Sequence, residues 1–150
     1  MMKRAGIYIT TFLKKPLREK WLLIRILMLL FMVRFLLFVL PFKHFSKLLG
    51  NPAEDHQRDS PNPDPQYTHL VARFISNCSR LVPWDSKCLA QAAVGKIMMR
   101  KKNIPATVYF GVKKGDETEK IKAHAWLCVG SEIILGGDVA DQYTPISMFT

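Results

Sequence analysis

The amino-acid sequence predicts an α+β fold, with helices first and an antiparallel sheet after them. Apolar residues recur at helical spacing through most of the chain before residue 103. Residues 106–113 and 121–129 then read as two short strands around a charged loop, which is the pattern of a β-hairpin. The chain has 150 residues, of which 49% are hydrophobic, so it is long enough to bury a core as one domain of ordinary size.

The positive charge of the chain is concentrated at its N-terminal end. Of the formal net charge of +10, +9 lies in residues 1–50, which hold ten Lys and Arg against the one acid Glu19. This segment is able to meet anionic lipid or an acidic partner, but no nucleic-acid-binding module accompanies it, and we expect no nucleic-acid partner. The three cysteines are irregularly spaced, which argues against a disulfide scaffold or a zinc site and suits a reducing cytoplasm. We expect no cofactor and no metal.

The same N-terminal segment holds the most apolar stretch of the chain. Pro16 suits the start of a helix over residues 16–40, and residues 21–40 approach the length and apolarity of a membrane span. Arg25 and Arg34 interrupt that stretch, and the insertion cost of a central Arg, about 2.5–3.5 kcal/mol, roughly offsets the gain from its apolar neighbours. Hydropathy leaves two interpretations open, a membrane span and a soluble or peripheral helix. We favour the second, which allows peripheral membrane contact through residues 16–40.

Composition divides the chain into three parts. No small-residue cleavage site follows the long helix, which argues against a secretory signal. Residues 42–49 form a short amphipathic helix that ends at Gly50, and the polar, proline-rich residues after it cannot build a core. The expected parts are a basic, apolar helical arm over 1–50, a linker over 51–64 and a folded domain over 65–150.

The first helix of that domain begins with a strong start signal. Asp64 is a good N-cap, and Pro65 fits the first helical position. The apolar stripe that follows marks a helix that faces the core. It includes Cys78, which we interpret as a small buried side chain, whereas His69 lies off the stripe and is expected on the surface.

The next helix carries the residue that we take as the chemical centre of the protein. Asp85 and Ser86 are good N-caps, and the helix should run to about Lys102, with Asn103 in the left-handed position that ends it. Cys88 therefore lies in the first turn, where the positive end of the helix dipole favours the thiolate that attacks carbonyl groups. A lone cysteine near a helix start is more often a buried, inert side chain, so this interpretation needs support from elsewhere in the chain.

His124 and Asp138 supply that support. Cys88, His124 and Asp138 follow one another as a nucleophile, a base and an acid that orients the base. A three-residue hairpin loop would place His124 opposite Asp138, whereas a two-residue loop would turn Asp138 to the other face. We expect that register, or a bulge at 136–137, to bring Asp138 beside His124. Asp141 is the rival acid, and we interpret it as a solvated loop residue.

Several motifs of the chain occur together in one known group of proteins. They are Trp-x-x-x-Cys-Leu at 84–89, Ala-His-Ala-Trp at 123–126 and Gly-Gly-Asp-Val at 136–139, with further similarity at 104–112, at 143–146 and in the apolar helix that closes with Leu-Pro-Phe at 40–42. In these motifs the chain resembles the transglutaminase-like superfamily. It is most similar to the stand-alone leader peptidases of lasso-peptide biosynthesis, over most of its length apart from the linker.

The resemblance implies a papain-like arrangement, in which a helix carrying Cys88 packs on an antiparallel sheet carrying His124 and Asp138. It implies a cysteine peptidase that removes the leader peptide from a ribosomally synthesised lasso-peptide precursor. A separate ATP-dependent cyclase then closes a macrolactam. The implied partners are the precursor peptide, this cyclase and a separate small leader-binding protein, for which the arm is a candidate docking surface. Two alternatives stay open: another acyl transferase on the same triad, and a non-enzymatic, membrane-attached interaction protein.

Overall fold

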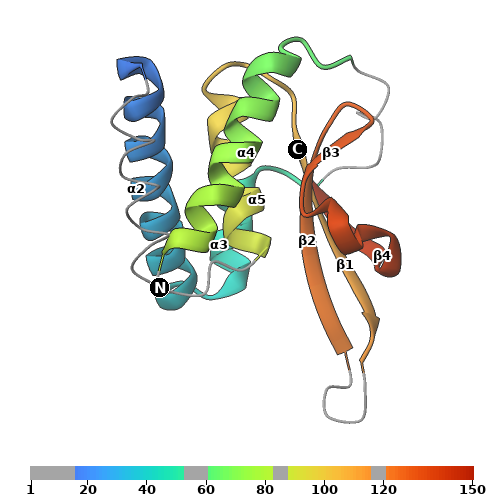
Figure 1. The fold of residues 1–150 in the computed structure, drawn as a ribbon. Helices are drawn as coiled ribbons and strands as arrows, with labels where there is room; N and C mark the ends of the chain where they lie inside the picture. Colours follow the sequence, from blue (N-terminus) through green and yellow to red (C-terminus); the bar gives the residue numbers. More distant parts are fainter. Residues whose placement is uncertain (1–15, 53–60, 83–87, 116–120) are drawn as a thin grey trace.

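The computed structural model describes residues 16–52, 61–82, 88–115 and 121–150. Within these ranges, helices precede a four-stranded antiparallel sheet, and the predicted α+β class is confirmed (Figure 1). Residues 1–15, the predicted caps Asp85 and Ser86, most of the linker and most of the charged hairpin loop lie outside the described residues.

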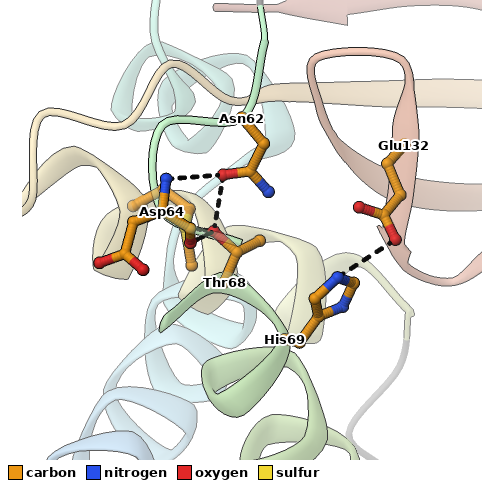
Figure 2. Close-up of polar contacts among 6 residues, drawn as sticks. Asn62, Asp64, Thr68, His69 and Glu132 are labelled. Atoms are coloured by element: carbon orange, nitrogen blue, oxygen red, sulfur yellow. Dashed lines mark hydrogen bonds and ion pairs between the residues drawn. The ribbon is translucent and has the colours of Figure 1, made fainter. Parts of the chain in front are cut away.

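The helices begin and end close to the positions that their local signals predict. They are α2 (Leu17–Val39), α3 (Phe42–Leu49), α4 (Pro65–Leu81) and α5 (Cys88–Arg100). At the start of α4, Asp64 Oδ1 accepts a hydrogen bond from the Tyr67 N–H at 3.0 Å, as the cap prediction requires. The Thr68 hydroxyl donates to the Asp64 carbonyl at 2.8 Å, and Asn62 Oδ1 accepts from the Asp64 N–H at 3.2 Å (Figure 2). Asn103 has the predicted positive φ, 54°, after the end of α5.

Helix α5 is the central element, because it packs against β2 on one side and against α2 and α4 on the other. Gly95 makes the approach to the sheet close. A Cβ at this position would lie 2.5 Å from a methyl group of Leu127 and 2.8 Å from one of Leu135. The Lys96 ammonium, one residue further on, is buried and donates to the Ala106 carbonyl at 2.6 Å. Burial, followed by the charge of Arg100, lowers the Lys96 pKa to about 8.

The sheet has two covered faces. Its strands are β1 (Thr107–Lys114), β2 (Ile121–Val129), β3 (Glu132–Leu135) and β4 (Thr144–Phe149), in the order β3-β2-β1-β4. One face joins the helices in the main core through residues such as Val108 and Leu127. On the other face the rings of Tyr109 and Trp126 stack with centroids 5.7 Å apart, next to Ala140 of the 3-10 helix η1 (Gly137–Gln142). Successive side chains of β2 point to opposite faces of the sheet, so Leu127 lies in the main core and Trp126 on the other face, as the predicted strand requires.

The register of β2 and β3 contradicts the predicted three-residue loop, but a bulge produces the pairing that this loop was expected to give. Val129 pairs with Glu132, so the hairpin loop has two residues and the three-residue loop is wrong. Gly130 has a φ of 58°, and a two-residue turn of this kind needs a positive φ at its first position. A bulge between Leu127 and Cys128, and not at the predicted 136–137, then shifts the pairing by one position, because Cys128 pairs with Ile133 but Leu127 pairs with Leu135. Extended along the strands, the shifted register is the one in which residue 124 faces residue 138, although the ladder itself ends at Leu135.

Helix α2 has both a buried side and an exposed apolar side. Ile26, Leu30 and Val33 are at most 1% exposed and belong to the same core as α4 and α5. Within the described residues, α2 is the one helix that is long and apolar enough to cross a membrane by length and composition. The division into arm, linker and catalytic domain stays a prediction, while the buried side of α2 contributes to the core that supports α5.

Candidate active site

Cys88 is the first described residue of α5 and the most accessible of the three cysteines. Cys78 and Cys128 are buried, whereas Cys88 is partly exposed, and none of the three forms a disulfide. Burial raises the pKa of the Cys78 thiol to about 11, so Cys78 stays protonated at neutral pH. Among the three thiols, that of Cys88 is therefore the one with solvent exposure, and its role as the nucleophile stays a prediction.

Cys88, His124 and Asp138 line one cavity of about 870 Å³, to which α4, α5, β2, β3 and η1 contribute. A second cavity of about 390 Å³ also has Cys88 and His124 in its wall, and apolar side chains such as Phe110 and Ile146 make up most of its remaining lining. The fold thus brings together the three residues predicted from sequence. The thiol and the imidazole lie where the larger, more polar cavity meets the smaller, apolar one.

The His124 imidazole is held by a backbone carbonyl. Its Nε2 lies 2.8 Å from the carbonyl oxygen of Gly136. A carbonyl can only accept, so Nε2 carries the hydrogen in this bond, and Nδ1 of the neutral ring keeps the lone pair. The ring also packs against Tyr143, with centroids 5.1 Å apart. This tautomer leaves Nδ1 as the nitrogen that can take a proton from a nucleophile.

Gly136 supplies the carbonyl that holds His124, a role that the sequence did not predict. Its φ is 76°, and a Cβ here would lie 2.7 Å from the Ala125 carbonyl oxygen and 3.2 Å from Trp126 Cα. Only glycine meets both conditions without strain, and the close approach to β2 is what brings the Gly136 carbonyl to His124. The one sequence signal for an unusual backbone here is the Gly-Gly pair at 136–137, which predicts a candidate bulge.

Asp138 lies in the first turn of η1, and its side chain is exposed. It lines the larger cavity, but within the described residues it forms no hydrogen bond with His124, whose Nε2 bonds to Gly136 instead. Asp141 is also exposed and is not among the residues that line this cavity. Asp138 and His124 thus line the same cavity, in agreement with the register that the bulge produces. The role of Asp138 as the orienting acid stays a prediction.

Side chains from two helices complete the wall of the larger cavity. Ser76, Ser79 and Arg80 come from α4, and Gln91 comes from α5. Gln91 follows Cys88 by three residues, and residues with this spacing share a helix face, so the sequence could have identified it. His69 Nε2 of α4 lies 3.4 Å from Glu132 Oε1 of β3, a surface contact that joins the two elements (Figure 2). In the described part of the chain, no cluster of three or more His, Cys, Asp or Glu residues could hold a metal ion.

A family model of the transglutaminase-like superfamily matches residues 29–148, which include α5, the sheet except the last residue of β4, and the second part of α2. The chain belongs to the transglutaminase-like superfamily. Comparison with curated proteins gave no match, and neither did comparison with solved structures. Transglutaminase-like domains are commonly catalytic, and the superfamily includes cysteine proteases and acyl transferases.

The geometry of this transglutaminase-like domain suits acyl-transfer chemistry. Cys88 is the first described residue of α5, and the sequence places it in the first turn, where N–H groups without a partner in the helix can stabilise an oxyanion. An imidazole whose Nδ1 is an acceptor lies in the wall of the same cavity. A thiol, a base and oxyanion donors are the groups that formation of a thioester from a peptide carbonyl requires, and the acceptor that resolves such a thioester decides between hydrolysis and transfer.

Proposed function

We propose that the protein is a cysteine peptidase that removes the leader peptide from a ribosomally synthesised lasso-peptide precursor. The observation that carries the peptidase part is the convergence of an accessible thiol, Cys88, and an imidazole, His124, in the wall of one cavity. The superfamily match supports cysteine chemistry in general. The lasso precursor as substrate rests on the sequence resemblance.

The reaction begins with attack of the Cys88 sulfur on the carbonyl carbon of the scissile peptide bond. The thiol proton passes to Nδ1 of His124, and the N–H groups at the start of α5 stabilise the oxyanion. The imidazolium then gives its proton to the departing nitrogen, which releases the core peptide with a new N-terminal amine. Water, deprotonated by His124, attacks the thioester, and the leader peptide leaves as a carboxylate. The new amine is the group that a separate ATP-dependent cyclase needs for macrolactam formation.

Gly136 and Asp138 support His124 in different ways in this mechanism. The Gly136 carbonyl accepts from Nε2–H at 2.8 Å and so selects the tautomer in which Nδ1 is the base. Asp138, in the wall of the same cavity, supplies a negative charge that stabilises the imidazolium while it exists. The orienting function that the sequence assigns to the carboxylate is thereby divided between a carbonyl and a carboxylate.

Substrate delivery depends on a partner in this proposal. The sequence resemblance implies that leader recognition and cleavage lie on separate proteins. A separate small leader-binding protein therefore presents the precursor to the cavity at Cys88. The polar part of the cavity wall, where Ser76 and Arg80 lie, contacts the peptide backbone around the scissile bond in this proposal.

The test is mass spectrometry of a candidate precursor mixed with the purified protein, with and without the leader-binding protein, in ¹⁸O-labelled water. We expect two fragments, with the label in the new carboxylate of the leader. Cys88→Ala should give no fragments, while Cys78→Ala, which removes a buried thiol outside the cavity, should still cleave. Cleavage by Cys88→Ala at the unchanged rate, or no cleavage with the partner present, would refute the proposal. An amine adduct without label would indicate an acyl transferase instead.

A further inference from the structure

The outward side of α2 is a continuous apolar surface. Trp21, Met28, Phe31, Phe35 and Phe38 are between 57% and 87% exposed, and they recur along the whole helix. Soluble monomers rarely expose contiguous apolar patches of this extent, so such a surface normally contacts a partner or a membrane. We refer to this exposed side as the α2 outer stripe.

Positive charge borders the α2 outer stripe on both sides. Helical spacing places Arg18 and Arg25 along one border, and Lys20 and Arg34 along the other. Glu19, the acid in the first turn, falls by the same spacing on the side of the buried core. The outward half of α2 is therefore apolar in the middle, basic at both borders and without an acidic residue.

We propose that the α2 outer stripe docks on an anionic lipid surface, with the helix lying in the plane of the interface. Aromatic and aliphatic side chains would enter the boundary between headgroups and acyl chains. Long basic side chains at the borders reach the lipid phosphates while their stems stay in apolar surroundings. The excess of cations in residues 1–50 adds a longer-range attraction to the same surface.

The opposite side of α2 argues against a membrane span. Ile26 and Leu30 are 0% exposed, and Val33 is 1% exposed, all in the core shared with α4 and α5. Moving α2 into a bilayer as a span would withdraw these side chains from that core. Docking in the interface plane leaves them in place.

Charge argues against a second copy of the chain as the occupant. Both borders of the α2 outer stripe are basic, so two such stripes placed face to face would bring cations together whichever way the helices run. Lipid docking also leaves the catalytic cavity accessible. Helix α2 and the sheet lie on opposite sides of α4 and α5, so the strand that carries His124 faces away from the proposed membrane (Figure 1).

The test is flotation of the full-length protein with vesicles of phosphatidylcholine alone and of phosphatidylcholine mixed with phosphatidylglycerol. We expect binding to the mixed vesicles, weakened by salt, and much weaker binding to the neutral ones. Phe35→Glu should abolish it, and Arg18→Gln with Arg25→Gln should lower the partition coefficient by about 25-fold, from about fivefold per charge. Ile121→Glu is the matched control, because Ile121 is 69% exposed but lies on β2, and this variant should bind normally.

Three results would overturn the proposal. The first is no binding to the anionic vesicles, or binding that depends neither on the lipid charge nor on the α2 substitutions. The second is a vesicle-bound protein that resists extraction with alkaline carbonate, which would show a span. The third is a protein that does not bind vesicles but forms a dimer or a complex with the leader-binding protein, where Phe35→Glu dissociates that dimer or complex.

Discussion

At the scale of single residues, the hydrogen bond from His124 to the Gly136 carbonyl decides how the candidate base is held. A carbonyl is present at every position of a chain, so no residue type marks one that will bind an imidazole. Asp138 stood out in the sequence because a carboxylate is a common partner for a catalytic His. The sequence was therefore sufficient to predict that Cys88, His124 and Asp138 lie together in one cavity wall, but not to predict the contact that fixes the imidazole tautomer.

The two acids near the cavity should differ in their effect on the rate. Asp138→Asn removes the charge that stabilises the imidazolium, but the Gly136 carbonyl still selects the tautomer. We therefore expect kcat/KM for precursor cleavage to fall by about 10- to 100-fold, less than the loss of about 10⁴-fold that a wrong tautomer causes. Asp141→Asn, the matched control outside the cavity wall, should change it by less than about twofold. The reverse ranking would assign the acid role to Asp141.

Gly136 should be less tolerant of substitution than its neighbour. Gly136→Ala combines a positive φ with an overlap of the new Cβ on the Ala125 carbonyl, so we expect a loss of about 1–3 kcal/mol in the free energy of unfolding. The carbonyl should also move off His124 and lower kcat. Gly137→Ala, whose Cβ would come no closer than 3.3 Å to Ile133, should keep both quantities near wild type. Urea unfolding and initial rates measure the two effects, and equal behaviour of the two variants would contradict this role of Gly136.

At the scale of elements, local signals predicted the helix boundaries but not the strand register. Asp64 and Pro65 mark the start of α4 because capping involves only neighbouring residues. The β2–β3 register depends on a two-residue turn and a bulge acting together, and each changes the pairing by one position. The sequence predicts that some device brings residue 138 toward residue 124, but it does not distinguish a longer loop from a bulge.

The position of α5 on the sheet should depend on the missing side chain at Gly95. Gly95→Val places new atoms against Leu127 and Leu135, so we expect overpacking to cost about 1–3 kcal/mol of unfolding free energy. Cleavage should also slow, because α5 carries Cys88. In a Leu127→Ala background the same substitution should cost less, since the cavity left by Leu127 accepts the valine. Equal costs in both backgrounds, measured by urea unfolding, would show that this contact does not set the distance between α5 and β2.

At the scale of the whole molecule, α2 serves the fold with one side and presents an apolar surface with the other. Hydropathy could not separate these functions, because it averages over both sides of the helix. Only the packing of α4 and α5 decides which residues, such as Leu30, are buried. This is why the sequence left the choice between a span and a soluble helix open.

The two sides of α2 should respond differently to truncation of a side chain. Leu30→Ala removes a fully buried side chain and should lower the free energy of unfolding by about 2–5 kcal/mol. Phe35→Ala, in the exposed α2 outer stripe, should lower it by less than about 0.5 kcal/mol. Urea unfolding of both variants in the absence of lipid checks this, and equal losses would mean that α2 does not pack on α4 and α5 through its Leu30 side.

The most direct test of the account is the alkylation rate of each cysteine by iodoacetamide at neutral pH, followed by peptide mass spectrometry. It needs neither a precursor nor a partner protein. We expect Cys88 to react first, with Cys78 and Cys128 protected in the folded protein by burial. His124→Ala should slow the reaction of Cys88 at least tenfold, because the imidazole no longer accepts the thiol proton. Alkylation of Cys88 at the same rate in His124→Ala and wild type would contradict the pairing of thiol and imidazole on which the proposed function depends.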